Sequence, residues 1–145
     1  FVLTDSDLQL PTTMPTDWLP KMFSALNQYR FALKISLPLL SSDITISQRE
    51  KVISREHGLV SHPMYRLLTL LLLPRDAGCL ACATDTTLSL YRTSRHFSTL
   101  SVRLGRAYSI RHLPWYQEFI QSSEFKYYTR HKNRLFGEWS SLLSE

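Results

Sequence analysis

The chain has 145 residues, 43% of them hydrophobic, which is enough for one domain with a buried core and marginal for two. Its apolar runs are far shorter than the roughly 20 residues of a membrane span, so no membrane partner is expected. Two cysteines do not make a disulfide framework and no signal-peptide pattern is visible, which together predict a reducing, cytoplasmic location.

Charge is distributed unevenly along the chain, whose formal net charge is +5. The first 20 residues contain three Asp and no base, whereas residues 92–134 contain nine Lys and Arg against two Glu. Such a basic stretch fits a solvated surface, a site for a small anionic ligand, or a nucleic-acid interface. The solvated surface is the commonest of these outcomes and nucleic acid the least favoured.

The N-terminal third predicts an extended lead-in, a helix and a strand. Residues 1–15 are the lead-in, and a helix follows that Thr16 or Asp17 can cap, with Pro20 tolerated only in its first turn. Residues 31–39 alternate apolar and other side chains as in a strand, with Pro38 at a strand end or on an edge. Residues 41–63 fit either a short helix after Ser47 or a continued β ribbon.

The apolar run 67–73, the turn cluster 74–78 and a second apolar run predict a β-hairpin. A strand this apolar is expected in the centre of a sheet, covered on both faces. The hypothesis therefore buries four consecutive leucines, Leu70, Leu71, Leu72 and Leu73.

The C-terminal part predicts two helices and a terminal hairpin. A helix is expected from Arg92 to Leu104, ending at Gly105, and another over 113–123 with Pro114 near its start. Residues 125–131 are rich in strand-forming side chains, 133–137 contain turn residues, and 139–143 could form a final strand. The fold class is α+β: one domain, 1–145, with an antiparallel sheet and flanking helices.

Known catalytic and metal-binding motifs do not account for this chain. Cys79 and Cys82 have zinc-like spacing but no second pair, and residues three apart in a strand face opposite sides, so two buried structural thiols are expected. The five histidines are scattered, and the aromatic residues between 115 and 128 suit a core better than a stacking platform. No metal site and no cofactor are predicted.

Several segments, taken in order, resemble the chorismate lyase family, whose fold is shared with the ligand-sensing domains of some GntR-type regulators. The resemblance runs from Asp17-Trp18-Leu19, through Cys79 to Thr84, to the basic run Arg130 to Gly137 and the ending Leu142-Leu143-Ser144-Glu145. It implies an α+β fold that encloses a small ligand cavity. It also implies cleavage of chorismate into 4-hydroxybenzoate and pyruvate.

The resemblance assigns roles to four residues. Arg66, Arg130 and Arg134 would contact the anionic groups of the substrate, and Glu145 would be the catalytic acid or base. The family's arginine in the first central strand aligns with Leu68, and Arg66 has the same strand parity two residues earlier. Such a reaction requires Arg forks on the carboxylates and a carboxyl group for proton transfer in a dry pocket.

The leading hypothesis is thus a protein that binds or cleaves a small cyclohexadiene or aromatic carboxylate, with lyase activity on chorismate. The alternative is a non-catalytic domain of the same fold that senses a ligand or acts through a protein partner, because the Arg at position 83 of the family pattern is Ala83 here. A nucleic-acid binder using the basic stretch 92–134 is the third hypothesis.

Overall fold

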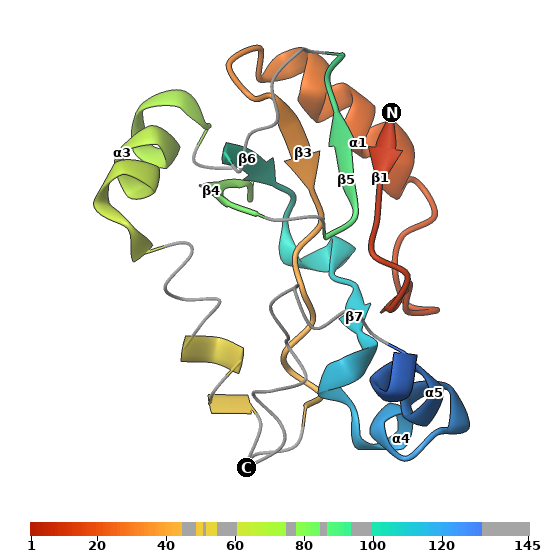
Figure 1. The fold of residues 1–145 in the computed structure, drawn as a ribbon. Coiled ribbons are helices and arrows are strands. Elements are labelled where there is room, and N and C mark those ends of the chain that lie inside the picture. Colours follow the sequence, from red (N-terminus) through yellow and green to blue (C-terminus); the bar gives the residue numbers. More distant parts are fainter. Residues whose placement is uncertain are drawn as a thin grey trace.

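The structure, a computed structural model, describes residues 1–44, 49–50, 52–54, 61–74, 78–84, 87–93 and 100–131. These residues form an α+β domain in which helices flank a five-stranded sheet of order β1-β5-β3-β6-β4, and a separate two-stranded ribbon pairs β2 with β7 (Figure 1). The strands are β1 Val2–Leu3, β2 Leu8–Gln9, β3 Lys34–Ser36, β4 Leu80–Ala83, β5 Ser89–Tyr91, β6 Leu100–Arg103 and β7 Arg111–His112. The helices are α1 Trp18–Gln28, α3 Pro63–Leu72, α4 Gln117–Ile120 and α5 Ser123–His131, with 3-10 turns η1 Arg106–Tyr108 and η2 Leu113–Trp115.

Helix α1 begins where the sequence predicts. Asp17 is its N-cap residue, and Pro20 lies in the first turn, where a missing N–H costs nothing. Met22, Ala25 and Leu26 are buried and belong to the main core. These three residues form the helix face that packs on the sheet, whereas Phe23 is exposed.

The sheet is mixed, which corrects the expectation of an antiparallel one. The central strand β3 pairs antiparallel with β5 and parallel with β6, so that Ile35 lies between Leu90 and Val102. Parallel neighbours need a long connection, and the chain between β3 and β6 contains α3, β4 and β5. Pro38 lies two residues beyond β3, so it marks the strand end and not an edge.

The predicted central strand over 67–73 is wrong, because residues 67–72 belong to helix α3 and Leu73 is the C-cap residue of that helix. Pro63 occupies its first turn, and the His62 ring nitrogen accepts a hydrogen bond from the Met64 N–H, so the helix begins before the leucine run. Leu70 and Leu71 are 70% and 69% exposed, and only Leu73 is buried as expected, at 6%. A short apolar run is compatible with a strand or with a helix, and here it forms a helix.

Two further expectations are overturned in the C-terminal part. Residues 100–103, predicted as the end of a helix, form strand β6, and Gly105 precedes the turn η1 instead of ending a helix. Residues 125–131, predicted as β-rich, lie in helix α5. Ser122 starts this helix, since its hydroxyl accepts the Phe125 N–H at 3.1 Å.

Other expectations hold or fall partly outside the described residues. The helix expected over 113–123 is present in pieces as η2 and α4, and Trp115 and Tyr116 are buried. Residues 49–50 and 52–54 are helical, which agrees with a short helix in the region left open. The predicted turn at 133–137 and strand at 139–143 lie outside the described residues.

Candidate anion-binding pocket

The two faces of the sheet differ in chemistry. Ile35, Leu90 and Val102 lie side by side on the face that belongs to the main apolar core. Successive side chains alternate across a strand, so the residues between them lie on the opposite face. That face is buried as well, yet it is polar, with the side chains Lys34, Ser36, Ser89, Tyr91, Ser101 and Arg103.

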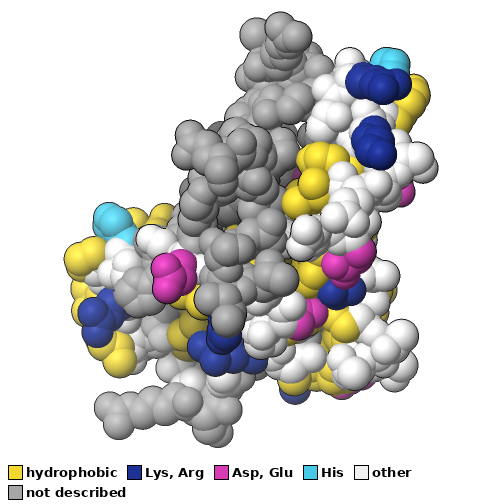
Figure 2. All heavy atoms as spheres, turned by 90° about the horizontal axis from the view of Figure 1, so that it is seen from below, with side chains coloured by type: hydrophobic (Ala, Val, Ile, Leu, Met, Phe, Trp, Pro, Cys, Tyr) yellow, Lys and Arg dark blue, Asp and Glu magenta, His cyan; other side chains and the backbone are white. Residues whose placement is uncertain are grey.

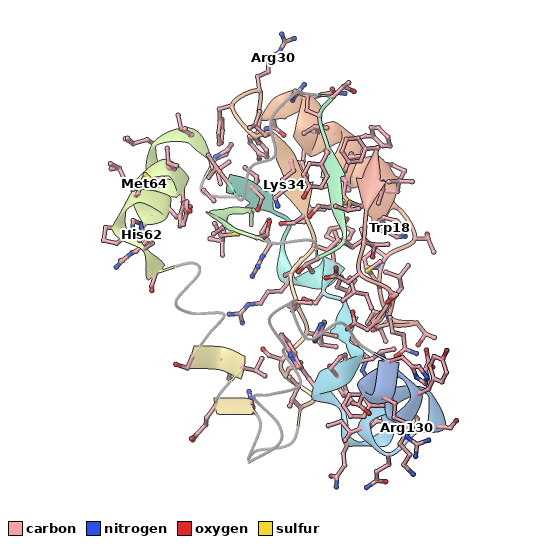
Figure 3. All side chains as sticks on the ribbon, viewed as in Figure 1. Trp18, Arg30, Lys34, His62, Met64 and Arg130 are labelled. Atoms are coloured by element: carbon pink, nitrogen blue, oxygen red, sulfur yellow. The ribbon has the colours of Figure 1, made fainter. Side chains whose placement is uncertain are left out.

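Lys34 is fully buried at the middle of this polar face (Figure 3). Its Nζ donates to the carbonyl oxygen of Thr84 at 2.6 Å and to the Tyr91 hydroxyl at 3.2 Å. The ammonium also lies 5.1 Å from the centre of the Tyr91 ring. These contacts compensate the loss of hydration that burial of an amine would otherwise cost.

Ser101 joins the neighbouring hydroxyl groups into a network. Its Oγ accepts a hydrogen bond from Thr84 Oγ1 at 2.8 Å and lies 3.1 Å from Ser36 Oγ and 3.7 Å from Cys82 Sγ. A buried network whose members are hydrogen-bonded is rigid and specifies one arrangement. The polar face is therefore rigid, and on this face Arg103 lies next to Ser36.

A cavity of about 580 Å³ extends from Arg103 over the end of the sheet. Its volume lies within the range typical of small-molecule sites. Arg103 comes from β6, Arg106 from η1, and Arg49 from the helical residues 49–50. The other described lining residues are Pro38, Leu39, Leu40, Ser41, Ser42, Ile53, Gly78, Leu80, Leu104 and Ser109, and none of the described lining residues is acidic. The cavity thus combines three cations with an apolar wall.

Two glycines bring the rim of this pocket together. Gly78 has a φ of +62°, a conformation that favours glycine, and precedes β4. A Cβ added to Gly105, after β6, would lie 3.3 Å from the Gly78 carbonyl oxygen. This close approach holds the start of β4 against the end of β6, beside Arg103 and Arg106.

A smaller cavity of about 240 Å³ lies on the α1 side, with Lys21, Tyr29 and Cys79 in its lining. Burial raises the pKa of the Cys79 thiol, although a hydrogen bond with Tyr29 opposes the shift. A thiol that stays protonated is a poor nucleophile, so this cavity offers little chemistry. The two cysteines do not form a disulfide; Cys82 is buried, as expected of a structural thiol, and Cys79 is half-buried.

Of the residues assigned by resemblance, the two that the structure describes, Arg66 and Arg130, do not lie together. Arg66 is exposed on α3 and Arg130 is exposed on α5, and these helices lie at opposite sides of the molecule, as Met64 and Arg130 show in Figure 3. Strand parity with position 68 does not apply to Arg66, since α3 is a helix. Arg134 and Glu145 lie outside the described residues.

The arginines that surround the pocket were not singled out from the sequence. Arg103 is one of the nine bases of the stretch 92–134 and lies within the helix expected from Arg92 to Leu104. The alternation in Leu100-Ser101-Val102-Arg103-Leu104 is nevertheless a strand signal that places Arg103 on one face with Ser101. Arg106 and Arg49 come from a 3-10 turn and an isolated short helix. No local pattern predicts that such residues converge on one cavity.

The basic stretch 92–134 does not form one surface among its described residues. Arg103 is buried, Arg92 donates to the Leu26 and Ala32 carbonyl oxygens, and Arg111 forms ion pairs with Asp43 and Glu118. On the face shown in Figure 2, Lys and Arg side chains stand at separate places, some beside carboxylates. The chain therefore divides its positive charge among separate structural tasks.

Comparisons add no relative to this description: no protein-family model, curated protein or solved structure matches the chain. The described helices include none of the length and apolar character needed to cross a membrane. Within the same residues, no three His, Cys, Asp or Glu side chains gather as a metal site would require. The fold and the pocket define an α+β domain with a basic, partly apolar cavity.

Proposed function

We propose that this protein binds a small cyclic carboxylate in the pocket formed by Arg49, Arg103 and Arg106. The observation that carries the proposal is the pairing of three arginines with an apolar wall in one cavity whose described lining contains no acid. Guanidinium groups bind carboxylates through paired hydrogen bonds, and the leucine and proline side chains would cover a ring. The resemblance to chorismate lyases suggests a cyclohexadiene or aromatic acid.

Binding without turnover is favoured by the same lining. Its described residues include no Asp, Glu or His that could transfer a proton to the ligand. Glu145, the acid or base that the resemblance assigns, lies outside the described residues. We therefore propose ligand binding as the first function and cleavage of chorismate as the second. A direct assay for product tests the second.

Two titrations test the proposal. Calorimetry with 4-hydroxybenzoate and with chorismate should give saturable binding, and Arg103→Gln should weaken it at least about thirtyfold, because a lost charge pair costs about 2–5 kcal/mol. Arg66→Gln and Arg130→Gln are matched controls, since both arginines are exposed and neither is among the described lining residues of the pocket. Absence of binding by the wild type, or equal losses in the controls, would reject the pocket.

Turnover is measured on the same samples. Formation of 4-hydroxybenzoate from chorismate is followed by ultraviolet absorbance, and Glu145→Gln should abolish it if that carboxyl group transfers the proton. Binding of chorismate with no product over hours would leave a ligand-sensing domain. If Glu145→Gln forms product as fast as the wild type, the protein is a lyase in which Glu145 is not the acid or base.

A further inference from the structure

One wall of the pocket is the irregular segment 38–42 that follows β3. Its first half is tied to the neighbouring chain by the backbone: the Leu40 N–H donates to the Ile110 carbonyl oxygen at 2.7 Å, and the Ile110 N–H donates to the Pro38 carbonyl oxygen at 2.9 Å. Leu39 and Ile110 form an isolated parallel bridge. The wall is thus held at its start by main-chain bonds.

The second half of the wall is held by the side chain of Tyr116. Its hydroxyl oxygen lies 2.7 Å from Asp43 Oδ1 and 3.2 Å from the Leu40 carbonyl oxygen, so its single proton is donated to the Asp43 carboxylate, with the Leu40 carbonyl oxygen as a second, longer acceptor. The two acceptors flank Ser41 and Ser42 in the chain. Tyr116 is buried, at 4% exposure. Burial raises the pKa of the Tyr116 hydroxyl, and the hydrogen bond to Asp43 raises it further, so the donor keeps its proton at neutral pH.

Arg111 completes the arrangement from β7. Its guanidinium carbon lies 3.8 Å from the centre of the Tyr116 ring, and its Nε lies 3.2 Å from Asp43 Oδ2. A second carboxylate, Glu118, pairs with Nη2 at 3.2 Å. Arg111 therefore holds both the ring and the carboxylate that the Tyr116 hydroxyl contacts, while it is not among the described lining residues of the pocket.

We propose that Tyr116, Asp43 and Arg111 are positioning residues that keep the wall 38–42 in its ligand-binding shape, an inference that rests on the proposed function. A wall that samples other shapes lowers the apparent affinity in proportion to the fraction of molecules with the competent shape. Ligand affinity thus depends on a hydroxyl group that does not line the pocket.

Tyr116→Phe is the sharpest test, because it removes the hydroxyl and keeps the ring on which Arg111 stacks. At a temperature where both proteins are fully folded, the dissociation constant for 4-hydroxybenzoate should rise about tenfold, as expected for the loss of one hydrogen bond to a carboxylate. Asp43→Asn should give a smaller loss, since its amide oxygen still accepts from Tyr116. Tyr127→Phe is the matched control, because Tyr127 is 66% exposed on α5.

Hydrogen exchange reports on the wall without any ligand. In Tyr116→Phe the amide of Leu40 should exchange faster, while amides of β3 should keep the wild-type rate. Unchanged exchange at Leu40 overturns the inference whatever the binding result. If the wild type binds 4-hydroxybenzoate and Tyr116→Phe binds it equally well, the inference is overturned and the proposed function stands. A wild type that binds neither 4-hydroxybenzoate nor chorismate fails the proposed function and the affinity effect together.

Discussion

The hydroxyl oxygen of Thr69 accepts a hydrogen bond from the backbone N–H of Ala81 at 2.9 Å, across the junction between α3 and β4. The same hydroxyl donates to the Tyr65 carbonyl oxygen one helical turn earlier, also at 2.9 Å. Because β4 lies at the edge of the sheet, this N–H faces outward from the ladder. Thr69, the one polar residue in the leucine run, thus caps the sheet edge.

Replacing Thr69 should therefore show how much this hydrogen bond between α3 and β4 stabilises the fold. Thr69→Val keeps the shape and removes the acceptor, and because Ala81 is 1% exposed its N–H would lose its partner in the interior. We expect a loss of about 1–3 kcal/mol in the free energy of unfolding, measured by chemical denaturation. Thr69→Ser keeps the hydroxyl and should lose much less. Equal losses in both variants would show that the methyl group, not the hydrogen bond, matters.

Leu71 at the end of α3 and Leu73 at its C-cap should differ sharply in their effect on stability. Leu73→Ala empties a core site and should cost about 2–5 kcal/mol. Leu71→Ala, at a position 69% exposed, should change the free energy of unfolding by less than about 0.5 kcal/mol. A large loss in Leu71→Ala would contradict the helix and restore a strand buried on both faces.

Sequence alone predicts the elements whose patterns have one interpretation. Helix α1 combines a cap candidate, an early proline and a regular apolar stripe, and each of these signals agrees with the others. The strand after it has a clear period of two and a proline that ends it. Local signals suffice here because they are consistent with the tertiary contacts that these elements make.

The same reasoning fails where residue preference and position disagree. Phe125, Tyr127 and Thr129 favour strands, yet Ser122 caps a helix there and Glu124 lies in its first turn. In α3 the nearly continuous leucines show neither a helical nor a strand period, and the helix-start signal, Pro63, lies four residues before the apolar run begins. Terminal signals outweigh propensity in both cases.

The pocket was beyond sequence reasoning for a different reason. Arg103 and Arg106 come from neighbouring elements, and the parallel pairing of β6 with β3 places Arg103 next to Ser36, close to the wall 38–42, while Arg49 reaches the cavity from a distant part of the chain. Predicting that pairing requires the order of strands in the sheet, which depends on long-range packing. The expectation of a small anionic ligand followed from charge alone, and it remains a proposal with a new set of residues.

Stability should depend on pH through Asp7. Burial raises the pKa of its carboxyl group above the ordinary value of 3.8, and His112, whose Nε2 lies 3.6 Å from Asp7 Oδ2, opposes this shift. Because the folded-state pKa is the higher one, the protonated carboxyl group favours folding: the contribution is full below pH 3.8 and is lost as pH rises through the folded pKa.

The Asp7→Asn variant isolates this contribution, since its amide does not titrate. Denaturation at a series of pH values should show the wild type losing stability relative to Asp7→Asn as pH rises from below 3.8 toward neutral. If the wild type instead gains stability relative to Asp7→Asn over the same pH interval, the ion pair with His112 outweighs burial, and the pKa of Asp7 is lowered on folding.

Nucleic acid should bind weakly, because the bases of the stretch 92–134 are divided among other contacts. Arg103 is buried and Arg111 is paired with two carboxylates, which leaves few described cations of this stretch to neutralise phosphates together. At about 100 mM salt, titration with single- and double-stranded oligonucleotides should give dissociation constants no tighter than roughly 10⁻⁴ to 10⁻⁶ M, the non-specific range. The affinity of a genuine interface would fall steeply with salt, with a log–log slope near the number of phosphates neutralised. Nanomolar binding with such a slope, reduced by Arg130→Gln, would place the partner on α5 and reverse the ranking of nucleic acid below a small anion.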